Sequence, residues 1–313
     1  MTAYPLFTAQ KPLRIGTRRS PLAMAQAQMA ASALRSRHAL AEAAVILVPI
    51  LASGDKIQDR PLAQLGGKAL WTKELERALS GGDIDVAVHS MKDVETVRPA
   101  DYRIGAMLPR ADVRDRMVGA PSIAALPMGA HVGTSSPRRA AQLLAQRRDL
   151  KISSIRGNVA TRLSKVESGE FDATLLAAAG LDRLSRPDTG HAIEVDQMLP
   201  AASQGAVGIE ALAARQDLQT MLSAVNHAPT FACVMAERAF LEALGGNCHS
   251  PVAALAVQQG AEIWLRGEIL SDDGNEKYAG DIRFVQGDVG GPHKLAEQLL
   301  RAASDRVKAL FGA

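Results

Sequence analysis

The sequence contains little cysteine, little net charge and no long apolar run. Cys233 and Cys248 are its only cysteines among 313 residues, too few for a disulfide framework or for a zinc site built on four cysteines. The formal net charge of +3 does not by itself indicate a nucleic-acid coat or a membrane-binding patch. No run approaches the roughly 20 apolar residues of a membrane span, and the first residues lack the basic start and apolar core of a secretory signal. These absences predict a cytoplasmic protein with no nucleic-acid and no membrane partner.

Several common site motifs are also missing. There is no Walker loop, no Gly-x-Gly-x-x-Gly, no His-Glu-x-x-His and no Cys-x-x-Cys, so neither a nucleotide-binding loop nor a metal site is predicted. The composition is that of a globular protein, with 47% hydrophobic and 22% charged residues. The length predicts about two domains, or three small ones.

Short β-like runs alternate with helical patterns over the first two thirds of the chain. This alternation is typical of βαβ units and predicts an α/β fold with mostly parallel sheets. Ser20 followed by Pro21 marks the start of the first helix. The predicted elements are, in order, Leu13–Thr17, Ser20–Arg37 (helix), Val45–Ile50, Lys68–Leu79 (helix), Ile84–His89, Val132–Thr134, Pro137–Arg148 (helix), Lys151–Ile155, Val159–Glu167 (helix) and Ala173–Ala178.

The pattern changes in the last quarter, after a helical run over Phe231–Leu244. Three β-like runs, separated by Gly and Asp turns, are followed by a terminal helix. This indicates a small antiparallel sheet with a helix against it. The runs are Val252–Gln258, Ile263–Leu270 and Tyr278–Val285, and the helix is expected from His293 to Leu310.

One short pattern occurs twice. Arg-Ile-Gly-Thr-Arg-Arg-Ser-Pro-Leu-Ala begins at Arg14, and His-Val-Gly-Thr-Ser-Ser-Pro-Arg-Arg-Ala begins at His131. Both run from a strand through Gly-Thr and Ser-Pro into a helix, with paired arginines nearby. The repeat predicts two similar lobes that face a cleft.

Arginine outnumbers lysine by 26 to 10. The guanidinium group is a planar, bidentate partner for carboxylate and phosphate, although an Arg-rich coding composition is an alternative explanation. Two arginine pairs, Arg18–Arg19 and Arg138–Arg139, lie at predicted helix starts, where the helix dipole disfavours cations. Cations at two similar helix starts, where they are unfavourable, indicate anion-binding sites. The alternative is that these arginines are solvated surface residues. Arg156 and Arg183 follow predicted strand ends, where open α/β sheets bind ligands, and Arg162 lies a turn or two into the next predicted helix.

Two other segments carry reactive groups. His89-Ser-Met-Lys-Asp-Val94 follows an apolar strand and offers donors and a carboxylate, although Asp93 could be a turn residue and Lys92 solvated. We expect His89 to be a structural, hydrogen-bonded group. Cys248 lies in a Gly-Gly-Asn-Cys-His loop, where cysteines are more often exposed and reactive than within helices such as that of Cys233. From these residues alone, Cys248 is either a nucleophile or a covalent anchor.

Seven motifs in this order closely resemble the porphobilinogen deaminase (hydroxymethylbilane synthase) family, from about Leu13 to the C-terminus. They are Arg-Ile-Gly-Thr-Arg-Arg-Ser-Pro-Leu-Ala, Ala-Val-His-Ser-Met-Lys-Asp-Val, Gly-Thr-Ser-Ser-Pro-Arg-Arg, Ile-Arg-Gly-Asn-Val-Ala-Thr-Arg, Ala-Ala-Gly-Leu-Asp-Arg-Leu, Gln-Gly-Ala-Val-Gly-Ile-Glu and the Gly-Asn-Cys loop. Three positions depart from the family pattern. Glu95 stands where proline is common, Ser203 where glycine is usual, and Asn247 where Gly or Ser adjoins the cysteine. These departures bear on loop shape rather than on the matched site positions.

The resemblance implies two lobes like those of periplasmic binding proteins, with mixed, mostly parallel sheets, and a small α+β third domain with a three-stranded antiparallel sheet. The implied boundaries are residues 1–108 with 205–224 for the first domain, 109–204 for the second and 225–313 for the third. It also implies a monomeric transferase that condenses four porphobilinogen molecules head to tail, with release of ammonia, into hydroxymethylbilane. The growing chain is built on a dipyrromethane cofactor bound through a thioether.

The resemblance assigns roles to individual residues. Asp93 matches the catalytic carboxylate and Cys248 matches the cofactor anchor. The other cofactor-binding positions are Ser90, Lys92, Thr134, Ser136, Arg138, Arg139, Arg156, Gly157 and Arg162. The implied substrate-binding positions are Arg18, Ser20, Arg183 and Gln204.

The implied chemistry agrees with the residues. Each pyrrole carries two carboxylates, and charge-assisted arginine–carboxylate bonds contribute roughly 1.5–3 kcal/mol each. Loss of ammonia leaves a positive charge shared with the pyrrole nitrogen, which a single carboxylate such as Asp93 can stabilise. Two rival classes are a two-lobed anion-binding protein, which needs neither Cys248 nor Asp93, and a cysteine hydrolase, which needs an aimed base and few arginines.

Overall fold

The computed structural model describes residues 6–51, 69–246 and 250–311. The chain divides into two compact units, Met1–Ala111 with Ala206–Phe231, and Asp112–Gly205 with Ala232–Ala313. The three domain boundaries implied by the sequence stay predictions. Within the described residues, no helix is long and apolar enough to span a membrane.

The first unit is built on a five-stranded sheet with the order β2-β1-β3-β10-β4. β1 is parallel to both β2 and β3, whereas β10 runs antiparallel to β3 and β4. The sheet is therefore mixed but mostly parallel, as predicted. The strands are β1 (Leu13–Arg18), β2 (Val45–Ile50), β3 (Val86–Ser90), β4 (Tyr102–Met107) and β10 (Val207–Leu212).

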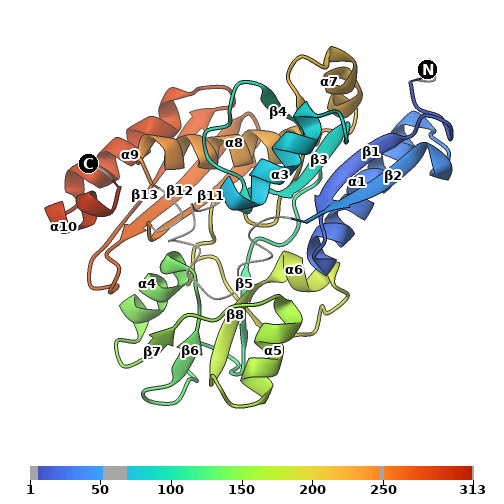
Figure 1. Cartoon of the computed structure of the whole chain (residues 1–313). Helices are drawn as coiled ribbons and strands as arrows, with labels where there is room; N and C mark the ends of the chain where they lie inside the picture. The colour runs from blue at the N-terminus through green and yellow to red at the C-terminus, as the bar shows by residue number, and fades with distance from the viewer. Residues whose placement is uncertain (1–5, 52–68, 247–249, 312–313) are drawn as a thin grey trace. The chain divides into compact units, whose positions relative to one another are not determined.

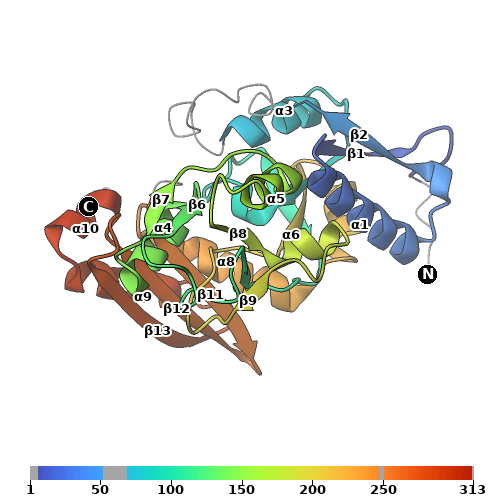
Figure 2. The same cartoon turned by 90° about the horizontal axis from the view of Figure 1, so that it is seen from below.

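Three helices pack around this sheet. Two short 3₁₀ turns also belong to the unit: η1 (Glu42–Ala44) precedes β2, and η3 (Met91–Asp93) follows β3. α1 (Pro21–His38) runs along β1 and β2 in both views (Figures 1 and 2). It starts where predicted, because the Ser20 hydroxyl accepts the backbone N–H of Ala23 and proline occupies the first helical position. The other two are α3 (Ala69–Ser80) and α7 (Gln216–Ser223). Small alanines of α1 and apolar side chains of β1, β3 and β10 form the core of the unit.

The second unit contains a sheet of the same design, with the order β7-β6-β8-β5-β9. β6 is parallel to β7 and β8, whereas β5 is antiparallel to β8 and β9. In both sheets the fourth strand is the antiparallel one, which confirms the prediction of two similar lobes. The strands are β5 (Asp115–Val118), β6 (His131–Gly133), β7 (Lys151–Ser153), β8 (Ala173–Ala177) and β9 (His191–Ile193), and the helices are α4 (Pro137–Gln146), α5 (Val159–Glu167) and α6 (Ala178–Arg183).

The repeated Gly-Thr pattern occupies equivalent places in the two sheets. Gly16 pairs with β2 and β3, and Gly133 pairs with β7 and β8. A side chain at Gly16 would collide with Ile84, and one at Gly133 would press on Ile155 and Phe171. Each glycine therefore permits close packing beside the central strand, which is a physical reason for the repeat.

The second unit also contains the C-terminal sheet β11-β12-β13, which is fully antiparallel as predicted (Figure 2). Its strands are β11 (Val252–Gln259), β12 (Glu262–Leu270) and β13 (Lys277–Val285), and its helices are α8 (Ala228–Ala243) and α9 (Gly290–Ala302). Cys233 lies with Phe240 in the core under this sheet. The prediction of one terminal helix over His293–Leu310 is wrong. α9 ends at Ala302, and Ser304 caps a separate short helix, α10 (Asp305–Lys308), which the turn η4 (Ala309–Phe311) follows.

Candidate active site

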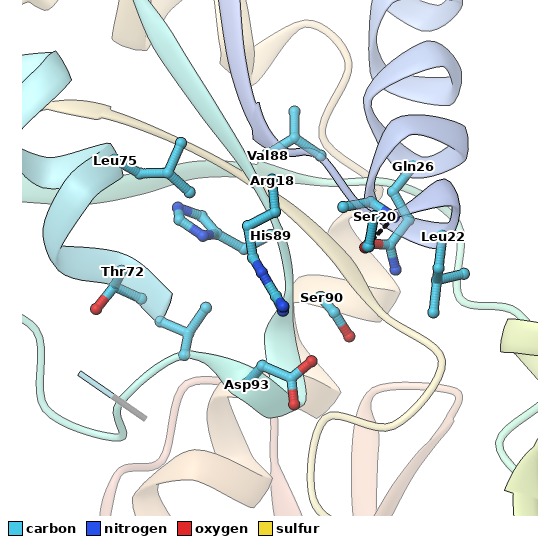
Figure 3. Close-up of a pocket in the computed structure, with 12 residues that line it drawn as sticks. Arg18, Ser20, Leu22, Gln26, Thr72, Leu75, Val88, His89, Ser90 and Asp93 are labelled. Atoms are coloured by element: carbon cyan, nitrogen blue, oxygen red, sulfur yellow. Dashed lines mark hydrogen bonds between the residues drawn. The ribbon is translucent and has the colours of Figure 1, made fainter. Parts of the chain in front are cut away.

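A pocket in the first unit opens where β1 and β3 end. About 450 Å³ of empty space lies between its lining residues, a volume that includes open solvent. Arg18 is the last residue of β1, Ser90 is the last of β3, and Ser20 caps α1. Because β1 and β3 are parallel, their carboxyl ends meet at one edge of the sheet. Figure 3 shows the end of the Arg18 side chain pointing towards Asp93, with Ser90 beside them.

Asp93 lies in η3, directly after β3. Its side chain is half-buried, and its carboxylate makes no hydrogen bond with any residue in the described part of the chain. The turn itself is fixed: Met91 is fully buried, and its backbone N–H donates to the carbonyl of Ala206 at 3.1 Å. Lys92 lies between them and is half-buried. The pocket thus holds a carboxylate that is fixed by its backbone and has its oxygens available.

A buried ion-pair network lies behind this pocket. Glu210 on β10 is fully buried and accepts three bonds, from His89 Nε2 at 3.0 Å, from Arg98 Nε at 2.9 Å and from Arg98 Nη2 at 3.0 Å. Burial acts to raise the pKa of Glu210, but the hydrogen bonds and charges of His89 and Arg98 outweigh it and lower that pKa from 4.5 to about 2. The prediction that His89 is a structural, hydrogen-bonded group is confirmed.

Arg98 also fixes the segment that follows Asp93. Its Nη1 donates to Glu76 at 2.8 Å and to Glu95 at 2.6 Å, and Glu95 accepts the hydroxyl of Thr72 at 3.0 Å. Glu95 is the residue that stands where the family commonly has proline. Here the carboxylate ties the Asp93 segment to α3 through hydrogen bonds, where a proline ring would fix the backbone instead.

The second unit collects the arginines predicted to bind the cofactor. Ser136 caps α4 by accepting the backbone N–H of Arg139, and the Thr134 hydroxyl accepts the backbone N–H of Ser136. Arg138 and Arg139 follow in the first turn, and both are buried, with 4% and 7% of their surface exposed. Each donates through Nη2 to the same carboxylate, that of Asp115, at 2.7 Å.

The remaining sequence-predicted residues of this unit lie around its sheet and loops. Arg156 is half-buried after β7 and hydrogen-bonds to no described residue. Gly157 has φ +104°, and a side chain there would collide with Thr161 of α5, so glycine is required. Arg162 donates to the carbonyl of Gly157 at 3.0 Å. Arg183 ends α6 and donates to the carbonyl of Gly205 at 2.7 Å.

Gln204 is buried and belongs to the same network as the arginine pair. Its Nε2 donates to Asp115 at 2.9 Å and to the carbonyl of Val113 at 2.8 Å. Neighbouring Ser203, where the family usually has glycine, adopts φ +66°. Its backbone N–H donates to the buried carboxylate of Glu237 at 2.6 Å. The glycine-type turn is therefore retained by a residue that carries a Cβ, at a cost in backbone strain.

Unpartnered guanidinium atoms provide a test of whether carboxylate ligands fit this unit. The Nε atoms of Arg138, Arg139 and Arg183 are buried and have no hydrogen-bond partner among the described residues. Buried donors are normally satisfied, and carboxylates are the natural partners of such guanidinium edges. The Nε atoms of Arg116 and Arg266 also lack a partner among the described residues, so this feature alone does not identify a ligand site. Arg138, Arg139 and Arg183 differ from them in being predicted ligand-binding positions.

The residues that sequence reasoning missed are acidic or distant partners. Asp115, Glu210 and Arg98 were not among the predicted site residues, yet they hold the predicted ones in place. A signal was available for Glu210, because an acidic residue inside an otherwise apolar strand is rarely buried without a partner. Cys248 and Asn247 lie outside the described residues. In the described part, no group of three His, Cys, Asp or Glu side chains could hold a metal ion.

Comparisons with known proteins agree with the sequence motifs. The family model "Porphobilinogen deaminase, dipyromethane cofactor binding domain" matches residues 13–220, and the model of the C-terminal domain of porphobilinogen deaminase matches residues 231–302. A porphobilinogen deaminase of Sphingopyxis alaskensis is 55% identical over 98% of both chains, and that of Paracoccus denitrificans is 49% identical over 87% of this chain and 88% of its own.

Solved structures of other proteins resemble the chain only distantly. The periplasmic VFT2 domain of Bordetella pertussis BvgS is 16% identical, with a TM-score of 0.39 over 72% of this chain and 90% of its own. The fold described above depends on the strand orders and not on this likeness. The two matched family models and the identities over nearly the whole length show that the chain belongs to the porphobilinogen deaminase family.

Proposed function

We propose that the protein condenses four porphobilinogen molecules, with release of ammonia, into the linear tetrapyrrole hydroxymethylbilane, on a covalently bound dipyrromethane. The observation that carries this proposal is the Asp93 carboxylate, which lies with Arg18, Ser20 and Ser90 in one pocket and accepts no hydrogen bond from a described residue. A protein that only binds anions has no use for a carboxylate in the pocket that also holds Arg18. The arginines supply affinity, and Asp93 supplies the chemistry.

Asp93 acts where positive charge develops on the substrate. When the aminomethyl side chain of porphobilinogen loses its nitrogen as ammonia, the methylene carbon stays on the ring, and its positive charge is shared with the pyrrole nitrogen. A fixed carboxylate stabilises that charge more in the transition state than in the ground state, which is the condition for accelerating the step. Asp93 is suited to this role because η3 holds its backbone while its oxygens are available to the substrate. The same carboxylate can accept and return the pyrrole N–H proton.

The second unit holds the acidic side chains of the pyrroles. Arg138, Arg139 and Arg183 offer buried Nε donors, and Arg156 offers a guanidinium group that no described residue occupies. Thr134, Ser136, Gly157 and Arg162 line the turns beside them, and Gln204 shares the carboxylate of Asp115. When bound, dipyrromethane supplies the pyrrole carbon to which the first substrate molecule is joined.

Cys248 is the proposed anchor of the cofactor, in a thioether. The support comes from the sequence, since Cys248 lies in the Gly-Asn-Cys motif, whereas Cys233 is a buried core residue beneath the C-terminal sheet. Cys248→Ser should therefore have the mass of the bare sequence, whereas the wild-type chain and Cys233→Ser should be heavier by two linked pyrroles. Intact mass spectrometry of the three purified proteins measures this. A two-pyrrole adduct on Cys248→Ser would refute the assignment, and a wild-type chain without any adduct would favour an anion-binding protein instead.

Asp93 is tested by a pair of substitutions that separates charge from shape. Asp93→Asn removes the charge, and we expect single-turnover ammonia release to fall by about 10²–10³, the usual cost of losing one placed electrostatic group. Asp93→Glu keeps the charge, displaced by about one methylene, and should retain more activity. A residue that only shapes the turn predicts the reverse order, because Asn replaces Asp well in turns and caps. An active Asp93→Asn with an unstable Asp93→Glu would overturn the catalytic assignment.

A cytoplasmic location and a monomeric state complete the proposal. Both rest on the sequence and on the family resemblance. Sedimentation of the purified protein over a range of concentrations tests the second.

A further inference from the structure

Asp115 is the centre of the arginine cluster in the second unit. It is the first residue of β5, the antiparallel strand, where it pairs with Ala177 at the carboxyl end of β8. Only 1% of its surface is exposed. One carboxylate oxygen accepts Arg138 Nη2 at 2.7 Å, and the other accepts Arg139 Nη2 at 2.7 Å and Gln204 Nε2 at 2.9 Å. A single carboxylate therefore bridges two guanidinium groups that are adjacent in the sequence.

The cluster is unbalanced in charge. Burial acts to raise the pKa of Asp115, but the positive charges and hydrogen bonds of Arg138 and Arg139 outweigh it and hold that pKa well below its usual range. Asp115 is thus a permanent anion between two buried cations, which repel each other. Next to the pair, Gln142 donates to Leu199 and to Glu268, and Lys277 pairs with Glu268. One anion in contact with two cations leaves an excess positive charge at the pair.

Protein acceptors orient both guanidinium groups but do not saturate them. Arg138 Nη1 donates to Gln142 Oε1 at 2.9 Å and to the carbonyl of Leu199 at 3.0 Å, and Arg139 Nη1 donates to the carbonyl of Leu175 at 2.8 Å. A guanidinium group has five N–H donors, and in both residues Nε is buried with no partner among the described residues. Asp115 occupies Nη2, so the edge that carries Nε stays in a fixed direction with donors to spare.

We propose that Asp115 is the positioning residue of this arginine pair: it holds both guanidinium groups so that their Nε edges receive the carboxylates of the pyrrole ligand. The inference rests on the proposed function of Arg138 and Arg139 as carboxylate binders. Asp115 itself contacts no ligand, because both of its oxygens already accept hydrogen bonds from protein donors.

The experiment compares loading with stability. Asp115→Asn, Asp172→Asn and the wild-type chain are purified in parallel, and intact mass gives the fraction of each that carries two pyrroles. Asp172 is the matched control, since it lies at the opposite, amino-terminal edge of the same sheet, where it accepts the backbone N–H of His131 at 2.6 Å. We expect the loaded fraction to fall at least fivefold for Asp115→Asn and to stay at the wild-type level for Asp172→Asn.

The second readout is the porphobilinogen concentration that gives half-maximal formation of the first enzyme–substrate adduct, measured on the loaded molecules. A guanidinium group that Asp115 no longer holds would lose one charge-assisted bond to the ligand, which predicts a rise of about tenfold to a hundredfold for Asp115→Asn. A purely structural role predicts a lower melting temperature with unchanged loading and an unchanged half-maximal concentration, and that result would overturn the proposal.

A further pair of variants covers the case in which Asp115→Asn does not fold, because an unpaired buried charge is strongly destabilising. Asp115→Asn combined with Arg139→Gln keeps the wild-type charge of the cluster, and it is compared with Arg139→Gln alone, in which Asp115 still holds Arg138. The proposal requires the double variant to load less than the single one; equal loading would refute it. A wild-type chain at the mass of its bare sequence would instead refute the proposed function itself, so the two failures are distinguishable.

Discussion

Behind the Asp93 pocket, Arg98 forms ion pairs with three carboxylates, those of Glu76, Glu95 and Glu210. Its side chain is only 9% exposed, and that of Glu210 is fully buried. Replacing Arg98 by Met keeps an unbranched apolar stem of the kind that fills gaps in cores, and it removes the charge. The change in stability of Arg98→Met therefore reports mainly the loss of the ion pairs rather than a loss of packing.

The expected cost follows from burial. An exposed ion pair contributes about 0–1 kcal/mol, whereas removing one partner of a buried pair costs about 3–5 kcal/mol because a buried charge is left without compensation. Among the described residues, Arg98 is the only arginine bonded to Glu210, and His89 is the other partner. We therefore expect Arg98→Met to lower the free energy of unfolding of the first unit by about 3–5 kcal/mol at pH 7.

Native-state hydrogen exchange locates the effect. Amides of β10 (Val207–Leu212) and β3 should exchange about a hundredfold to a few thousandfold faster in Arg98→Met, whereas those of β11 to β13 should not change. Arg77→Met is the matched control, because Arg77 is 77% exposed and lies 3.9 Å from Glu74. It should cost less than about 1 kcal/mol.

The difference in stability between the wild-type protein and Arg98→Met should also depend on pH, in a direction set by the pKa of Glu210. The pKa of Glu210 is about 2 when folded and 4.5 as the reference for the unfolded chain, so the stability that depends on its charge is fully present above pH 4.5 and is lost as the pH falls towards 2. In Arg98→Met, burial is opposed by His89 alone, so the variant should lose less stability than the wild-type protein on acidification. The difference between the two proteins should be largest near pH 7 and should shrink below pH 4.5. A difference that is independent of pH, or one no larger than that of Arg77→Met, would refute the reasoning.

Three further predictions concern single positions. Ser203→Gly should raise the free energy of unfolding by about 0.5–1 kcal/mol, because glycine accepts φ +66° without the steric cost of a Cβ; Ser203→Ala, which keeps the Cβ, should bring no gain in a denaturant titration. Gly16→Ala should lower it by about 1–3 kcal/mol, since the new methyl group meets the buried side chain of Ile84; a melting temperature equal to that of the wild-type protein would contradict the packing argument. Arg156→Lys should change the free energy of unfolding by less than about 0.5 kcal/mol, because no described residue bonds to Arg156. It should nevertheless reduce the number of pyrroles added, measured by intact mass, because lysine lacks the bidentate guanidinium fork. Normal turnover would make Arg156 a solvated surface residue.

The sequence by itself determined the features that depend on neighbouring residues. Val45–Ile50 and Val159–Glu167 have the predicted bounds, because hydrophobic periodicity is a local property. The starts of α1 and α4 followed from Ser-Pro pairs, in which the hydroxyl caps the helix and proline fits its first turn. The motifs also carried the family, since each is a short stretch of contiguous residues.

Predictions from local sequence patterns failed for segments whose structure depends on contacts with residues far along the sequence. β5 and β10, the antiparallel strands that define both sheets, were not predicted. β5 has only four residues, and both strands are fixed by partners far along the sequence, as when Asp115 pairs with Ala177. The break between α9 and α10 had a local signal in the Ser304 cap, which the apolar pattern across it obscured.

Only the tertiary structure decided which charged residues pair with one another. Arg98 and Glu210 lie 112 positions apart and meet because β10 returns to the first sheet. Arg138 and Arg139 were predicted as ligand-binding cations, but their common anion, Asp115, becomes visible only when β5 is placed beside β8. The physical reason is that periodicity and capping depend on a few neighbouring residues, whereas the partner of a buried charge depends on which strands lie side by side in the sheet. The residues of the chemistry could therefore be named from the sequence, and the groups that hold them in position could not.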